Sequence, residues 1–128
     1  VETSEVKFES TGKKKRETRP WGSYEVLTSG PGFQTKRLTV KAEKRLSLQW
    51  HRHRDETWVV ARGTAEGTVG EEQHTLGRGE TMFVARNIHH RIANISSVEP
   101  LEIIEIQTGD YLGEDDIVRV EDDFGRAE

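Results

Sequence analysis

The chain is 128 residues long and contains no cysteine, so it has room for one domain, and disulfides and thiolate metal sites are excluded. Charged residues make up 33% of the chain and the formal net charge is −4, with an acidic excess near the C-terminus, so we expect no nucleic-acid-binding surface. No apolar run approaches the ~20 residues that a membrane helix needs, and we expect a cytoplasmic protein without a membrane partner.

A polar N-terminal segment precedes a series of short strands. Residues 1–18 lack sustained periodicity, so we expect a flexible arm there and a single domain over residues 19–128. Within that domain, β-prone runs are separated by turns rich in Gly, Asn, Ser and Pro. The expected strands are 23–27, 33–40, 45–53, 57–61, 64–69, 72–76, 81–84, 90–94 and 101–106, and residues 114–118 fit either a short helix or a last strand. This pattern predicts an all-β fold, an antiparallel sandwich or barrel.

The third expected strand has an unusual polarity. Leu46, Leu48 and Trp50 alternate onto one face, whereas His51 and His53 share the other. If the polar face lines the interior, the apolar face needs cover from the N-terminal arm or from a second subunit. We therefore expect a homodimer.

Histidines and a carboxylate form a candidate metal site. His51 and His53 are two residues apart, Glu56 follows after a turn, and His90 begins a later strand. Ligand sets of this kind bind divalent first-row metals and leave coordination positions open. We expect one divalent ion on His51, His53, Glu56 and His90, with zinc as the first choice and manganese, iron or nickel as alternatives. The adjacent His89 would point the opposite way on a strand, so only one of the two should bind.

The spacing of these residues resembles the two cupin motifs. His-x-His-x2-Glu-x6-Gly at residues 51–63 resembles the first motif, with one residue fewer than usual between the second His and the Glu. Gly-x5-Ala-x-Asn-x2-His-x3-Asn at residues 79–94 has the spacing of the second motif and selects His90 over His89. The resemblance implies the double-stranded β-helix of the cupin superfamily, a jelly-roll barrel.

A longer resemblance covers roughly residues 19–126. Arg-Pro-Trp-Gly at 19–22, Arg-Leu-Ser-Leu-Gln at 45–49 and Tyr-Leu-Gly-Glu-Asp-Asp-Ile-Val-Arg at 111–119 are similar to the C-terminal domain of type II mannose-6-phosphate isomerases. Those are bifunctional proteins with an N-terminal mannose-1-phosphate guanylyltransferase domain, which this sequence lacks. The chain also departs from the family at Trp50, usually Met or His, and at Thr57, usually His.

As its main function the resemblance implies a metal-dependent isomerase that interconverts mannose 6-phosphate and fructose 6-phosphate. Glu105, a carboxylate within an apolar strand, and Arg54, beside the ligands, are the expected catalytic residues, and Glu56 is an alternative base. The phosphorylated sugar is expected to contact Lys36, Arg37, Arg45 and Gln49, although Gln49 also fits a role as a wall residue.

A different class of function stays open beside the enzyme. The chain could be a non-catalytic cupin module that binds a sugar or nucleotide-sugar, or that partners a separate mannose-1-phosphate guanylyltransferase. The retained ligand set favours the enzyme, whereas Thr57 and the missing partner domain favour the module. The fold alone cannot decide, because one fold hosts many functions.

Overall fold

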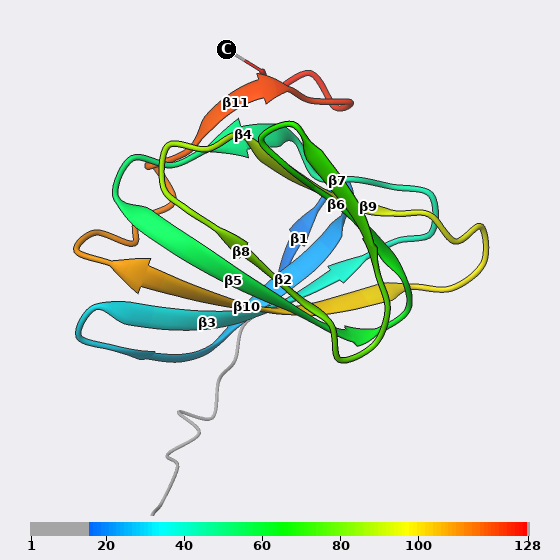
Figure 1. Cartoon of the computed structure of the whole chain (residues 1–128), viewed down its shortest axis with the longest axis horizontal. Coiled ribbons are helices and arrows are strands. Elements are labelled where there is room, and N and C mark those ends of the chain that lie inside the picture. The colour runs from blue at the N-terminus through cyan, green and yellow to red at the C-terminus, as the bar shows by residue number, and fades with distance from the viewer. Residues whose placement is uncertain (1–15, 128) are drawn as a thin grey trace, which may run out of the picture.

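The computed structural model describes residues 16–127, in which the chain forms eleven β-strands and no helix (Figure 1). In chain order the strands are β1 Arg16–Arg19, β2 Gly22–Gly30, β3 Phe33–Val40, β4 Leu48–Trp50, β5 Arg54–Arg62, β6 Ala65–Val69, β7 Glu72–Leu76, β8 Thr81–Val84, β9 His90–Asn94, β10 Leu101–Gly109 and β11 Val118–Glu121. No helix able to span a membrane occurs among these residues.

The strands form two antiparallel sheets with side chains packed between them. The larger sheet has the order β1-β2-β3-β10-β5-β8 and the smaller one β11-β4-β9-β6-β7. Strands far apart in the chain become neighbours: β10 lies between β3 and β5, and β9 lies between β4 and β6. The predicted all-β, antiparallel architecture is therefore confirmed.

Two central strands divide the interior into an apolar half and a polar half. Alternate residues of β5 and β10 are buried because successive side chains of a strand point to opposite faces. At one end of these strands Ile103 pairs with Val60, and at the other Gln107 pairs with Glu56. The apolar half holds Trp58, Val60, Leu101 and Ile103, and the polar half holds Arg54, Glu56, Glu105 and Gln107.

The apolar half supplies the hydrophobic core. Trp58, Leu101 and Ile103 are each at most 1% exposed, and burying one large apolar side chain contributes about 1.5–3 kcal/mol relative to its exposure. Phe124, beyond the last strand, also packs against this core. The C-terminal segment is thus tied to the domain by burial as well as by the pairing of β11 with β4.

The strand predicted at residues 45–53 is much shorter than expected. β4 comprises only Leu48–Trp50, and the chain bends at Arg52 and His53 before β5 begins. Gly109 accommodates this bend: a Cβ there would lie 2.2 Å from the carbonyl oxygen of His53. Leu46 packs against the core instead of facing outward, so the predicted outward apolar face is reduced to the half-buried Leu48 and Trp50.

Both ends of the described chain differ from the sequence prediction. Residues 16–18, assigned to the flexible arm, belong to β1 and pair with β2. The rest of that predicted arm, residues 1–15, lies outside the described residues. At the other end, residues 114–118 were expected to form a short helix or a last strand, but residues 114–116 form a turn and a bend, and the last strand begins only at Val118.

Candidate metal centre and adjoining pocket

Three of the four predicted metal ligands meet in the polar half of the interior. His51, Glu56 and His90 are buried, and each offers one ligand atom within 4.8 Å of the others. Nε2 of His51 lies 3.2 Å from one Glu56 oxygen, and Nε2 of His90 lies 3.7 Å from the other. His51 and His90 come together because β4 and β9 are paired through Gln49 and His90.

The two imidazoles are oriented as metal ligands usually are. Nδ1 of His51 donates to the carbonyl oxygen of Asp116 at 2.6 Å, and Nδ1 of His90 donates to that of Ile88 at 3.0 Å. Each Nε2 then points toward Glu56. Burial also lowers the pKa of His90, which favours its neutral ring near pH 7. Two imidazoles and a carboxylate suit a divalent metal, so this cluster could hold one.

His53, the fourth predicted ligand, lies outside the cluster. Its side chain is exposed and packs edge-on against Tyr111, with ring centroids 6.1 Å apart. The prediction assumed a straight strand, in which residues two apart share a face. The bend at Arg52 and His53 breaks that alternation, so the side chain turns to the surface.

Arg54 is part of the cluster. Its side chain is 5% exposed, and its Nε donates to Glu56 at 2.9 Å. One terminal nitrogen, Nη2, lies 3.2 Å from Nε2 of His51. The other, Nη1, is buried and has no hydrogen-bond partner among the described residues.

The pKa values of Glu56 and Glu105 are shifted in opposite directions. Burial, together with the negative charge of Glu56, raises the pKa of Glu105 well above its usual range. Burial alone would also raise the pKa of Glu56, but contacts with His51 and Glu105 and nearby positive charge hold it well below its usual range. Glu105 is therefore the member of the pair that holds a proton more readily. Gln107 supports the pair by donating to Glu105 at 3.1 Å.

The segment between β10 and β11 closes over the metal cluster. The Asp116 carboxylate accepts the backbone N–H groups of Arg52 and His53 at 3.0 and 2.9 Å, while its carbonyl holds His51. Burial opposes ionisation of Asp116, but these two N–H groups lower its pKa. The segment thus fixes both the bend and the orientation of one ligand.

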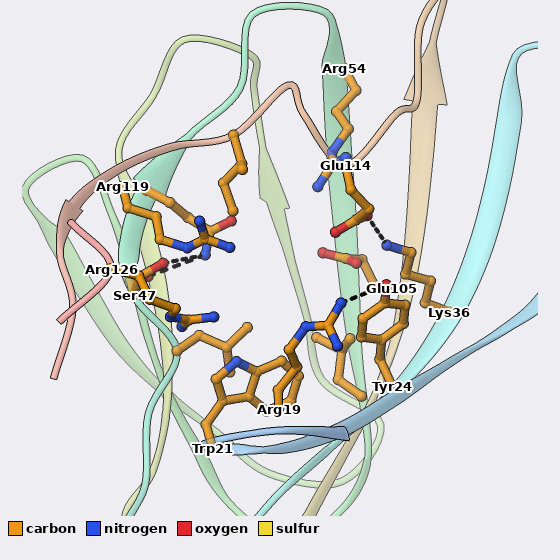
Figure 2. A pocket seen from close by; sticks show the side chains of 14 residues that line it. Arg19, Trp21, Tyr24, Lys36, Ser47, Arg54, Glu105, Glu114, Arg119 and Arg126 are labelled. Carbon is orange, nitrogen blue, oxygen red and sulfur yellow. Dashed lines mark hydrogen bonds and ion pairs between the residues drawn. The ribbon is translucent and has the colours of Figure 1, made fainter. Parts of the chain in front are cut away.

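A pocket opens beside the cluster. It is lined by five basic residues, Arg19, Lys36, Arg54, Arg119 and Arg126, and by two acidic ones, Glu105 and Glu114. A smaller cavity against Glu56 and His90 shares Gln49 and Glu105 with it. Figure 2 shows Arg119 and Arg126 on one side of the pocket and Lys36 and Glu105 on the other.

The predicted sugar-phosphate contacts are divided between this pocket and the surface. Lys36 and Gln49 line the pocket, where Lys36 forms an ion pair with Glu114 and Gln49 donates to Ser47 Oγ at 2.8 Å. Arg37 is half-exposed and lies 4.0 Å from Glu102. Arg45 is exposed and binds both oxygens of Asp123, at 2.8 and 2.9 Å. Neither Arg37 nor Arg45 lines the pocket, and each is paired with a carboxylate elsewhere on the surface.

Three arginines of the pocket escaped the sequence prediction. Arg19 comes from β1, Arg119 from β11, and Arg126 from the chain beyond β11. Arg19 and Arg119 belong to the stretches that carry the family resemblance, which is the one signal that pointed to them. These arginines are far from the histidines in sequence, so motif spacing could not place them at the pocket. Arg119 and Arg126 lie there because β11 pairs with β4.

Sequence comparison with known proteins matches the chain to one family of domains. The family model described as mannose-6-phosphate isomerase C-terminal matches residues 7–122. The xanthan biosynthesis protein XanB of Xanthomonas campestris pv. campestris is 51% identical over 109 residues, which are 85% of this chain and 23% of that protein. The mannose-1-phosphate guanylyltransferase ManC of Salmonella typhimurium is 44% identical over 109 residues, 85% of this chain and 22% of that protein. The chain therefore spans less than a quarter of the length of these relatives.

Solved structures agree on the fold. An RmlC-like cupin from Shewanella frigidimarina superposes with a TM-score of 0.70 at 16% identity, covering 87% of this chain and 94% of that one. At this identity the likeness concerns the fold alone. The predicted cupin fold, the jelly-roll barrel, is confirmed.

The relatives correct the predicted main function. The sequence interpretation made the chain a mannose-6-phosphate isomerase, but relatives at 44% and 46% identity are named mannose-1-phosphate guanylyltransferases, and others are named for xanthan and alginate biosynthesis. The prediction of an isomerase as the main function is wrong on this evidence. The alternative, a module that partners a guanylyltransferase, is better supported.

Proposed function

The chain belongs to the family of mannose-6-phosphate isomerase C-terminal domains, and from this premise we propose that it is the cupin module of a mannose-1-phosphate guanylyltransferase system. In this role it binds a mannose phosphate or a nucleotide-sugar in the basic pocket, next to a bound metal ion. The domain over residues 19–128 is the unit that we assign to this function.

The main support for the proposal is that the matched segment occurs within larger proteins named for guanylyl transfer. Relatives named mannose-1-phosphate guanylyltransferase match the chain over 109 and 110 residues, which are 22% and 23% of their length. At 44–46% identity the module is retained within proteins named for guanylyl transfer. The ligand of such a module is best sought among the substrate and product of that transfer, mannose 1-phosphate and GDP-mannose.

The chemistry of the pocket supports a phosphorylated ligand. Five basic side chains face two carboxyl groups, and burial, together with Glu56, raises the pKa of one of them, Glu105. The lining therefore carries an excess of positive charge in a partly desolvated place. Guanidinium groups bind phosphate oxygens in pairs with geometric specificity, and Lys adds a point charge.

A single divalent ion, with zinc as the first choice, fits the cluster of His51, Glu56 and His90. Two imidazole Nε2 atoms and a carboxylate are a donor set that zinc accepts, and the imidazoles are already held by backbone carbonyls. When bound, the ion would act as a Lewis acid toward a ligand oxygen. Arg54 and Glu105 line the pocket and would orient that ligand, Arg54 through its Nη1–H, which has no partner among the described residues, and Glu105 through its carboxyl group.

We retain the homodimer as a proposal. Trp50 stays half-exposed although His89 stacks on it at 6.4 Å between ring centroids and Arg52 lies over it at 4.9 Å. Leu48 is half-buried on the same strand. Sedimentation equilibrium tests the proposal, with Trp50→Lys expected to shift the protein from dimer toward monomer.

The experiment for the main proposal supplies the full chain to the guanylyltransferase part of the Salmonella typhimurium relative, freed of its matched segment. We expect the two polypeptides to associate in analytical ultracentrifugation, and the chain to bind mannose 1-phosphate or GDP-mannose by calorimetry. The Shewanella frigidimarina cupin is the matched control, because it shares the fold at 16% identity. Association no stronger than this control, together with no heat from either ligand, would refute the proposal.

A further inference from the structure

Two arginines that line the pocket carry buried hydrogen-bond donors without a partner in the described part of the chain. Among the described residues, two buried side-chain nitrogen atoms lack a partner, Nη1 of Arg54 and Nε of Arg119. Both arginines line the same pocket. A buried donor without an acceptor costs about 1–3 kcal/mol, and more when it is charged, so the coincidence of two such donors calls for a ligand that offers acceptors.

The charges of the pocket are unequally neutralised. Lys36 is paired with Glu114, Arg54 with Glu56, and Arg126 with Asp122 at 2.7 Å. Arg119 forms no ion pair within residues 16–127, although it is only partly exposed. Burial, with the positive charge of Arg126, lowers the pKa of Arg119. The protein thus holds a poorly solvated guanidinium without an ion-pair partner among the described residues, which an anion would supply.

Two further arginines line the pocket together with Arg119. Arg126 reaches the pocket from the chain beyond β11, and Arg19 reaches it from β1, where its Nη2 donates to Tyr24 at 3.3 Å. In Figure 2 Arg119 and Arg126 lie together on one side, with Arg19 below the opening between them and Lys36. Lys36 lies across the pocket from them and is paired with Glu114.

We propose that Arg119, assisted by Arg126 and Arg19, is the phosphate subsite of this pocket, and that a sugar phosphate bound there extends toward Arg54 and Glu105. The inference rests on the proposed function, since it takes the ligand to be a phosphorylated sugar. It moves the phosphate contact from Arg37 and Arg45, which lie outside the pocket, to arginines of the first strand and of the C-terminal segment. The Nε–H of Arg119 and the Nη1–H of Arg54 gain acceptors at the two ends of one ligand.

The test measures binding of mannose 1-phosphate, inorganic phosphate and unphosphorylated mannose to the full chain by calorimetry, with the ³¹P resonance as a direct reporter of the phosphate. Arg119→Met keeps an unbranched apolar side chain and removes the guanidinium. We expect it to weaken mannose 1-phosphate binding roughly tenfold to hundredfold, as for loss of a charge-assisted contact. Arg119→Lys, which keeps the charge without the fork, should lose less.

Arg62→Met is the matched control, because Arg62 has an exposed side chain on β5 and is paired with Glu102 outside the pocket. It should leave the affinity within about twofold, in line with the small effect of exposed charges. Near-ultraviolet circular dichroism verifies that each variant is folded. If Arg119→Met is not folded, Arg119→Lys and Arg126→Met carry the test with the same expectation of weaker binding.

The outcomes separate the subsite from the function. Mannose 1-phosphate binding that Arg119→Met leaves unchanged would overturn the subsite and spare the proposed function. Binding of inorganic phosphate that depends on Arg119, without binding of any sugar phosphate, would support an anion site at Arg119 and overturn the sugar-phosphate ligand assigned to it. Failure of the wild-type chain to bind mannose 1-phosphate or inorganic phosphate would overturn the subsite, whereas association with the guanylyltransferase part and binding of GDP-mannose would still uphold the proposed function.

Discussion

The two halves of the barrel interior are built from the same strands but hold opposite kinds of residue. In β5 and β10 one alternation buries Trp58 and Ile103 in one half and Glu56 and Glu105 in the other. The apolar half gains free energy from each side chain that it removes from water. The polar half buries charged groups, whose desolvation offsets most of their mutual attraction. The alternation of side chains along a strand therefore determines which residues are buried. Whether a buried residue stabilises the fold or belongs to the candidate site depends on whether its side chain is apolar or charged.

The apolar half should show the largest effect on stability. Ile103 is fully buried against this core, so Ile103→Ala should lower the free energy of unfolding by about 2–5 kcal/mol through lost burial and a residual cavity. Urea unfolding measures this difference. A loss below about 1 kcal/mol would mean that the two halves do not differ in the way described.

Zinc binding should stabilise the wild-type protein but not a variant that lacks two of the three proposed ligands in the polar half. Zinc at a hundred times its dissociation constant should raise the free energy of unfolding by about 2.7 kcal/mol. The variant His51→Ala/His90→Ala should lose this gain and bind no zinc by elemental analysis, because two of three ligands are removed.

The matched control for the metal is His53→Ala. His53 is exposed and outside the cluster, so this variant should keep zinc, as should His89→Ala. Loss of zinc in His53→Ala would restore the four-ligand set predicted from sequence and contradict the three-ligand cluster.

The carboxyl pair should make stability depend on pH in a defined direction. The pKa of Glu105 is raised in the folded state, first by burial and then by Glu56. Its contribution is fully present below the unfolded pKa and is lost as pH rises through the folded value. Gln does not titrate, so Glu105→Gln should become more stable relative to wild type between pH 5 and pH 8, measured by thermal unfolding.

The contribution of Glu56 to stability should depend on pH in the opposite direction. Its pKa is lowered because the contacts with His51 and Glu105 and nearby positive charge outweigh burial, so its contribution is present above the unfolded pKa and is lost as pH falls through the folded value. A relative stability of Glu105→Gln that does not change between pH 5 and pH 8 would argue against a protonated Glu105.

Surface charges should have the smallest effect. Arg45 and Asp123 form a well-aligned pair, but their side chains are 44% and 43% exposed, so Arg45→Gln should cost at most about 1 kcal/mol of unfolding free energy. It should also leave mannose 1-phosphate binding unchanged, because Arg45 does not line the pocket. Calorimetry checks this, and a marked loss of affinity would return Arg45 to the site.

Much of the fold and part of the site followed from local patterns. Alternation and turn residues predicted most strands within a few residues, because burial on one face of a strand leaves a period of two. His51, Glu56 and His90 were predicted as ligands from motif spacing, and the structure brings them together. These features depend on short stretches of chain and on one pairing between β4 and β9.

The rest depends on geometry that no local pattern contains. The bend that turns His53 outward is held by Asp116, more than sixty residues away in sequence. The separation of pocket arginines from surface arginines depends on their partners: Arg45 meets Asp123, whereas Arg119 meets no carboxylate among the described residues. Spacing could not reveal either, because both follow from long-range contacts of the C-terminal segment.

The central claim is that the polar half is kept for a phosphorylated ligand and contributes little to the fold. The most direct measurement compares the free energy of unfolding with and without saturating mannose 1-phosphate in wild type and in Arg54→Met/Glu56→Leu/Glu105→Leu. Without ligand, we predict that the apolar variant is at least as stable as wild type, as often follows replacement of buried ion pairs. Ligand at a hundred times its dissociation constant should stabilise wild type by about 2.7 kcal/mol and leave the variant unchanged. A variant that is several kcal/mol less stable, with a wild type that shows no ligand-dependent gain, would contradict the claim.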